Sequence, residues 1–417
     1  MACTRPPLPG GGCAYRGARM ALEPIADAAH LAHAPATCSG FSWAMRPTHS
    51  SAAALHRTSF STDLGELEVI RGGETKLAAA VTALCDRYDP AGIFVYQTCV
   101  PAMTGDDVGG LCKSLSARYR RPIVPVDLPG FAGDRDFGSR AAGDVLLNHL
   151  IGTREPLIRT TADVALVGEA NVAGEMTVLR PLLAEAGIRL LASIPGDGKV
   201  AEIAGAHRAR LVVSLCSQSL GGLADKMGAR FGLPVLQASF HGMANTAASL
   251  RAIAAHLAVP GLSRQVEAAI RRHEAETRQR LAPLLPALAG RRALLLTGGI
   301  KAWAMATALG ELGLEVVATV VQKTSVEERR CAHAVLGNDR VWTGIDEQRV
   351  AEAQADVVLS GDGYRASALK AGRPWVEINH FRPMALCGYQ GAVNLARRIH
   401  TALSHPIRLD RKREEAA

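Results

Sequence analysis

The chain repeats one pattern along most of its length. A short apolar run rich in branched side chains is followed by a Gly or polar turn and then by an amphipathic stretch with helical spacing. In the first part, strands are predicted at 92–96 and 122–126. Each leads through a loop into a predicted helix, at 106–119 after the first strand and at 139–150 after the second. Strands that alternate with helices of this length indicate βαβ units and therefore a parallel sheet.

The same alternation starts again twice further along the chain. The second part has predicted strands at 165–167, 189–193, 211–215 and 235–238, and predicted helices at 177–186, 223–231 and, interrupted at Pro260, 246–288. The third part has predicted strands at 293–296, 314–319 and 357–359 and a predicted helix at 303–312. We therefore predict an α/β fold of three Rossmann-like domains with parallel sheets, at 1–160, 161–289 and 290–417.

The composition is that of a folded, globular protein, with 48% apolar and 21% charged residues. No apolar run has the features of a signal peptide or the length of a bilayer span, so we expect a cytoplasmic protein whose thiols stay reduced. The formal net charge of +8 favours anionic partners. The basic residues are scattered, however, except for a run at 408–413, which we interpret as a solvated tail rather than a nucleic-acid arm.

The nine cysteines carry the most chemical interest. Cys13 follows three Gly, Cys38 stands next to a Ser–Gly pair, and Cys99 lies in the loop after the strand at 92–96. A neighbouring Gly lets a bulky inorganic cluster approach the backbone closely. Cys216 directly follows the strand at 211–215, where ligands bind in α/β folds. From the residues alone, cluster ligation and burial as core thiols both remain open for these four.

Other motifs narrow the range of functions. Cys85, Cys112, Cys331 and Cys387 lie in helical or apolar patterns, and we interpret them as structural. The chain has no GxGxxG, no P-loop, no HExxH and no GxSxG motif. A nucleotide site, a hydrolytic zinc site and a serine hydrolase are therefore not supported.

An ordered series of sequence blocks resembles the nitrogenase component 1 family, and within it the cofactor-assembly subunits rather than the catalytic ones. The series includes YQTCVPAMTGDD at 96–107, TGGIKAW at 297–303 and GYQG at 388–391. Further blocks lie at 3–18, 24–33, 38–43, 128–131, 151–156, 167–175 and 215–217, so the resemblance extends from about residue 3 to residue 400. The segments 44–60 and 361–369 depart from the family pattern.

The resemblance implies two metal-cluster sites. Cys13, Cys38 and Cys99 match the cysteines that hold a [4Fe-4S] cluster at the interface with a NifN-type partner, in an α2β2 heterotetramer. Cys216 matches the thiol associated with the iron-molybdenum cofactor or its iron-only precursor. The implied function is cofactor assembly, with NifB as the precursor donor, the NifH Fe protein docking nearby, and homocitrate added on the scaffold.

Two further features favour assembly over catalysis. Catalytic α subunits carry a molybdenum-ligating His shortly before the GYxG block, whereas here Asn379 falls at the matching place by our count, with His380 one residue away. They also carry a Gln and paired His after a PGF-like turn, and residues 133–140 contain neither. An amide binds metal weakly, which suits a cofactor that must leave. Lys301, Arg135 and Arg140 are the candidates for holding the anionic cluster or homocitrate, against the alternative of plain surface charge.

The alternative is a catalytic subunit of a nitrogenase-like reductase: nitrogenase α, a protochlorophyllide or chlorophyllide reductase subunit, or a methylthio-alkane reductase. A cluster-free interaction subunit is the third reading. In such a subunit we would expect the cluster-binding cysteines to be replaced, whereas Cys13, Cys38, Cys99 and Cys216 are all present.

Overall fold

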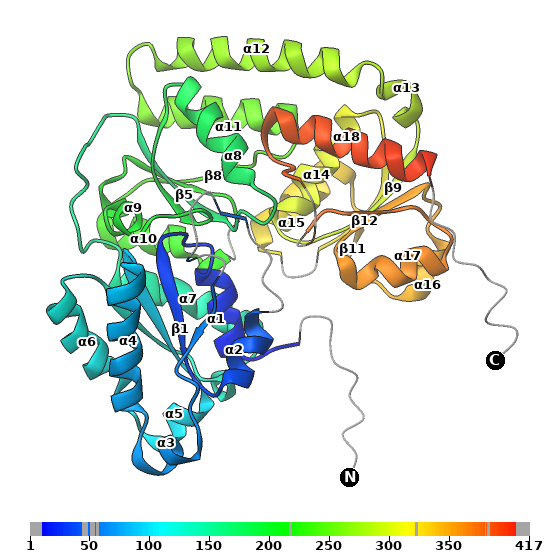
Figure 1. Ribbon diagram of the computed structural model, residues 1–417. Helices are drawn as coiled ribbons and strands as arrows, with labels where there is room; N and C mark the ends of the chain where they lie inside the picture. The colour runs from blue at the N-terminus through cyan, green and yellow to red at the C-terminus, as the bar shows by residue number, and fades with distance from the viewer. Residues whose placement is uncertain are drawn as a thin grey trace, which may run out of the picture. The chain divides into compact units, whose positions relative to one another are not determined.

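The computed structural model describes residues 11–43, 49–50, 55, 58–216, 219–321, 324–379, 381 and 384–405 (Figure 1). Its strands form three sheets, with strand orders β2-β1-β3-β4, β6-β5-β7-β8 and β11-β10-β9-β12-β13. The pairings of known register in these sheets are parallel. The predicted α/β class with parallel sheets is therefore confirmed.

The chain forms two compact units, which do not coincide with the predicted domains. The first unit comprises Met1–Asn171, Arg189–Ser214 and Ser219–Leu236, and the second comprises Val172–Ile188, Leu215–Gln218 and Gln237–Ala417. The predicted boundaries after residues 160 and 289 both fall in turns between helices and strands. The division into three domains at those residues stays a prediction.

The first two sheets share one hydrophobic core in the first unit, in which Tyr96 and Val212 are buried. The strands are β1 (Ala28–His33), β2 (Phe60–Ser61), β3 (Gly92–Gln97), β4 (Ile123–Asp127), β5 (Asp163–Glu169), β6 (Arg189–Pro195), β7 (Leu211–Ser214) and β8 (Val235–Gln237). The helices are α1 (Ala14–Leu22), α2 (Ala36–Trp43), α3 (Glu66–Arg71), α4 (Glu74–Tyr88), α5 (Cys99–Thr104), α6 (Val108–Tyr119), α7 (Arg135–His149), α9 (Val200–Ala204) and α10 (Leu223–Phe231), with short 3-10 turns at η2 (Gly130–Ala132), η3 (Ala206–Arg208) and η4 (Ser219–Gly221).

The sequence pattern correctly predicted most of these strands, but it did not predict β1 near the start of the first unit. β1 has the sequence AAHLAH and is buried on both faces, as parallel strands are, although it contains no β-branched residue to mark it. Helix α7 begins at Arg135 rather than at the predicted residue 139. The side chain of Asp134 accepts a hydrogen bond from Phe137 N at 2.7 Å and so caps the helix four residues earlier.

The second unit is built on the five-stranded sheet, with helices on both faces. Leu295 and Leu359 pack with Met305 and Ile399 on one face, whereas Leu294 and Val358 pack with other residues on the opposite face. The strands are β9 (Arg292–Leu296), β10 (Glu315–Val320), β11 (Val341–Trp342), β12 (Val357–Ser360) and β13 (Trp375–Glu377). The helices are α8 (Glu175–Glu185), α11 (Met243–Leu257), α12 (Leu262–Leu281), α13 (Leu285–Leu288), α14 (Ile300–Glu311), α15 (Val326–Leu336), α16 (Glu347–Glu352), α17 (Arg365–Lys370) and α18 (Gly388–Ser404), with the 3-10 turn η5 (Asp362–Tyr364).

The long helical region predicted at 246–288 is three helices. α11 ends before Ala258, which adopts a left-handed conformation with φ +50°, and α12 begins after Gly261. α12 packs against α11 and α18 (Figure 1). In the described residues, no helix combines the length and apolar character that a bilayer crossing requires.

Two glycines allow helices α1 and α7 to cross at backbone contact. A Cβ atom at Gly138 would lie 1.9 Å from the carbonyl oxygen of Ala14, and one at Gly17 would lie 1.9 Å from that of Arg135. Neither neighbour is a flexible side chain, so neither can move aside cheaply. The crossing therefore requires glycine at both positions, and it fixes the segment that carries Cys13.

We expect Gly138→Ala to lower the free energy of unfolding by about 3 kcal/mol, because the added methyl group forces the two helices apart. Chemical denaturation measures this change. The matched control is Gly310→Ala in α14, where a Cβ meets no atom within 4 Å. That variant should be as stable as the unmodified chain or slightly more stable. Equal stability of the two variants would contradict the close crossing.

Candidate metal-cluster sites

Three secondary structure elements of the first unit present Cys13, Cys38 and Cys99. Cys13 is the N-cap of α1 and pairs with Asp134 in an isolated antiparallel bridge. Cys99 is the first residue of α5, immediately after β3 and Thr98, whose hydroxyl donates a hydrogen bond to His33 O at 2.9 Å. Cys38 lies in the first turn of α2. All three side chains are half-buried.

The three thiols lie in one neighbourhood. A Cβ atom at Gly130 would lie 2.9 Å from Cys99 Sγ and 3.3 Å from Cys13 Sγ, so both sulfurs border the same glycine. Burial raises the pKa of the Cys38 thiol, and the nearby Cys99 and Cys13 raise it further. The structure thus brings together the three cysteines that sequence spacing alone left separate.

The chemistry of this group suits a cluster better than a single ion. In the described residues, no three His, Cys, Asp or Glu side chains converge tightly enough to hold one metal ion. In an iron–sulfur cluster each thiolate binds a different iron, so the sulfurs must border a cavity rather than meet at a point. Gly130 has no side chain to crowd the sulfurs of Cys99 and Cys13, and a larger residue there would come within 2.9 Å of Cys99 Sγ. The donor set therefore fits an iron–sulfur cluster.

A buried arginine connects the helix that follows Cys13 to the helix that carries Cys38. Arg19 of α1 is 1% exposed, and its Nη1 atom donates to Tyr15 Oη at 3.1 Å and to Ser42 Oγ of α2 at 2.7 Å. Its Nη2 atom donates to Ser59 Oγ at 2.9 Å and lies 3.6 Å from Glu23 Oε1. A buried charge with this many partners is costly to disturb, so it fixes the two helices relative to one another. No motif in the sequence marks this network.

Two further arginines place positive charge beside Cys13. A Cβ at Gly12 would lie 3.1 Å from Arg16 Cδ and 3.5 Å from Arg135 Cβ. The pKa of Arg16 is lowered, first by burial and then by the charge of Arg135, whereas Cys13 raises it. Arg135, a predicted candidate for holding the anionic cluster or homocitrate, lies in the first unit beside the residue that precedes this cysteine, and its role stays a prediction. Arg140, predicted for the same role, is an exposed residue of α7 in the first unit.

The other predicted site residues belong to the second unit. Cys216 lies two residues after β7 ends, Lys301 is in the first turn of α14, and Asn379 follows β13; all three are half-buried. Thr297, at the end of β9, donates to Asn379 Oδ1 at 3.2 Å, and Asn379 N donates to Glu377 Oε1 at 2.7 Å. Asn379 is thereby held at the carboxyl edge of the sheet, where α/β folds bind ligands.

Some residues at this edge were not found from the sequence. A Cβ at Gly361 would lie 2.8 Å from Asn379 Nδ2, so the glycine at the end of β12 leaves space for the amide. Cys387, interpreted as a structural thiol, is buried at the start of α18 with its sulfur 4.0 Å from His241 Nε2. The two residues of each pair are too far apart in the sequence for a local pattern to predict their contact. His380, Cys3 and the basic run at 408–413 lie outside the described residues.

Comparisons with known proteins identify the family and the fold. The family model described as nitrogenase component 1 type oxidoreductase matches residues 13–404. The solved structure "Nitrogenase Cp1 at pH 6.5" shares the fold with a TM-score of 0.84 at 21% identity, covering 97% of this chain and 92% of that one.

Curated relatives share much more sequence. The nitrogenase iron-molybdenum cofactor biosynthesis protein NifE of Bradyrhizobium diazoefficiens is 44% identical over 97% of this chain and 76% of its own length. The NifE proteins of Rhizobium meliloti (43%, covering 97% of this chain and 88% of theirs) and Klebsiella pneumoniae (40%, covering 96% and 92%) match similarly. The predicted membership among the cofactor-assembly subunits is confirmed. The chain belongs to the nitrogenase component 1 family and, within it, to the NifE cofactor-biosynthesis proteins.

Proposed function

We propose that this chain is a scaffold subunit on which the nitrogenase iron-molybdenum cofactor is assembled. In this proposal Cys13, Cys38 and Cys99 hold a resident [4Fe-4S] cluster, and Cys216 holds a cofactor precursor as cargo. The observation that carries the proposal is that Cys13 and Cys99 border Gly130 and that Cys38 lies near both, in a member of the NifE group. A [4Fe-4S] cluster takes four protein ligands, so three cysteines imply a fourth from elsewhere.

A partner subunit is the proposed source of that ligand. Phe131, directly after Gly130, is 64% exposed, and Met103 of α5 is 79% exposed. Ile70 of α3, a helix that contacts α5, is also 79% exposed. Large apolar side chains gathered on the elements around a metal site mark a protein interface. We propose that a NifN-type subunit covers them, in a heterotetramer of the component 1 type.

The second unit supplies the proposed cargo site. Cys216 as a thiolate binds iron at one end of the precursor. Asn379 faces the carboxyl edge of the sheet as a weak ligand, and Lys301 supplies positive charge for the anionic cargo or for homocitrate. NifB is the proposed donor of the precursor and the NifH Fe protein the proposed agent of its maturation. Arg135 and Arg140 are proposed as supporting cations, with Arg135 acting at the resident cluster through its place beside Cys13.

A donation assay separates a scaffold from a reductase. The chain is isolated anaerobically with its NifN-type partner and its cargo, and mixed with nitrogenase component 1 that lacks the cofactor. With NifH, ATP, molybdate and homocitrate present, the recipient should gain substrate reduction. The pair alone with Fe protein and ATP should reduce no substrate. The opposite pattern, turnover by the pair and no activation of the recipient, would identify a reductase and refute the proposal.

A further inference from the structure

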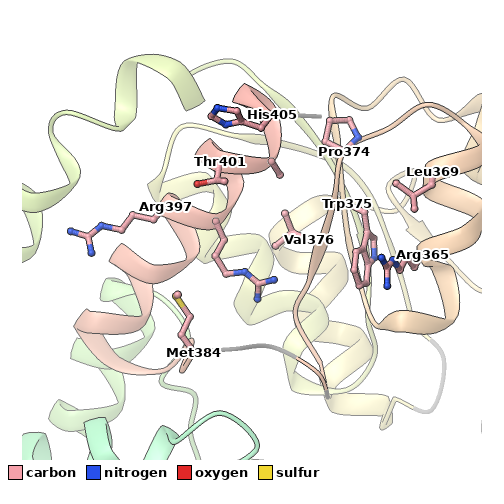
Figure 2. A pocket seen from close by; sticks show the side chains of 11 residues that line it. Arg365, Leu369, Pro374, Trp375, Val376, Met384, Arg397, Thr401 and His405 are labelled. Atoms are coloured by element: carbon pink, nitrogen blue, oxygen red, sulfur yellow. The ribbon is translucent and has the colours of Figure 1, made fainter. Parts of the chain in front are cut away.

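A cavity of about 420 Å³ lies in the second unit, between α17, β13 and α18 (Figure 2). Its walls include the apolar side chains of Leu369, Val376 and Met384, together with the ring of Trp375. The volume is within the range of pockets that bind small organic molecules, about 300–1,000 Å³, and such pockets are mostly apolar with a few polar groups. The cavity therefore has the size and the lining of a ligand site.

The charge of the lining has one sign. Its eleven residues include three arginines and a histidine, and none of these eleven described residues is acidic. The guanidinium of Arg365 lies 5.3 Å from the centre of the Trp375 ring. Figure 2 shows the two side chains next to one another. Within the described part of the chain, Arg365 makes no ion pair. An exposed cation at the mouth of an apolar cavity attracts a molecule with an anionic end and an apolar body.

The wall of the cavity is fixed before any ligand arrives. Trp375 Nε1 donates a hydrogen bond to Ser360 Oγ at 2.7 Å, which sets the plane of the indole. Arg398 Nη1 donates to Glu377 O at 2.7 Å. Glu377 in turn accepts the hydrogen bond from Asn379 N, so the cavity wall is connected through one residue to the proposed cargo site. Rigid walls reduce the entropy lost on binding.

We propose that this cavity binds a small amphipathic anion. The apolar body lies against Leu369, Trp375 and Val376, and the anionic group, a carboxylate, sulfonate or phosphate, meets the guanidinium of Arg365. A charge-assisted hydrogen bond of this kind contributes enough to change affinity tenfold or more. This site is separate from the thiolate chemistry of cluster assembly, and it does not depend on the function proposed above.

The test uses 8-anilinonaphthalene-1-sulfonate, an aromatic sulfonate that becomes fluorescent in apolar sites, titrated into the full chain. We expect one saturable site. Arg365→Gln should raise the Kd about tenfold or more, whereas Arg264→Gln should change it less than about twofold. Arg264→Gln is the matched control because it removes the same charge from an exposed arginine of α12 that does not line the cavity. The uncharged dye N-phenyl-1-naphthylamine should bind more weakly and be indifferent to Arg365→Gln.

A second variant tests the apolar wall. Leu369→Glu places a carboxylate inside the cavity and should abolish binding of the sulfonate. Circular dichroism checks that each variant is folded, and the exposed position of Arg365 keeps the test decisive if Leu369→Glu does not fold. The proposal is overturned if the dye shows no saturable binding, if Arg365→Gln and Arg264→Gln weaken binding equally, or if a folded Leu369→Glu variant binds normally.

Discussion

Replacing Cys99 with alanine should remove the resident cluster, with a loss of about four iron atoms per pair of subunits. Cys99 Sγ borders Gly130 next to Cys13 Sγ, so the substitution removes one of the thiolates proposed to hold the cluster. With only two cysteines of this chain left as ligands, the cluster should not be retained. The measurement is iron content with electron paramagnetic resonance of the reduced protein, isolated anaerobically with its partner.

The control is Cys112→Ala in the same unit. Cys112 is fully buried in α6, where it packs in a hydrophobic cluster with Leu77 and Val81, and burial raises the pKa of its thiol to about 12. This variant loses a little stability from the small cavity but should keep its full iron content. If Cys99→Ala keeps the same iron and the same spectrum as Cys112→Ala, Cys99 is not a ligand.

Replacing Cys216 with alanine should give the reverse result. The resident cluster should remain, because its ligands are in the first unit, while the precursor should no longer copurify. The donation assay should then fall to background, since Asn379 and Lys301 alone offer an amide and a cation but no thiolate. Iron content should drop only by the amount that belongs to the cargo.

Cys331→Ala is the matched control for this second substitution. Cys331 is also a half-buried cysteine of the second unit, but it lies inside α15, and burial is the first of the causes that raise its pKa. The control should donate cofactor normally. If Cys216→Ala also donates cofactor normally, Cys216 does not hold the precursor. That result would not affect the role proposed for the three cysteines of the first unit.

The strand pattern was predictable because buried parallel strands repeat a simple signal. β3, β5 and β9 carry continuous apolar runs, and their positions followed directly from the sequence. β1 did not, because Ala and His replace the branched residues that mark a strand. Helix α18, which begins after Cys387, was also missed, although its buried face includes Val393 and Ile399.

The three cysteines proposed to hold the resident cluster were singled out from the sequence only through resemblance. Cys13, Cys38 and Cys99 are far apart in the sequence, and their meeting depends on how α1, α2 and α5 are placed. Arg19 fixes α1 relative to α2, and the paired glycines allow α1 to cross α7 closely. No local sequence pattern predicts either contact. Local periodicity reports burial on one element, whereas the site depends on contacts between elements.

The most direct test of the scaffold proposal is the iron content of the unmodified chain with its NifN-type partner, isolated without oxygen. The account predicts a brown protein with about four iron atoms per pair in the resident cluster, and additional iron when the precursor is loaded. A colourless pair that contains no iron would contradict it.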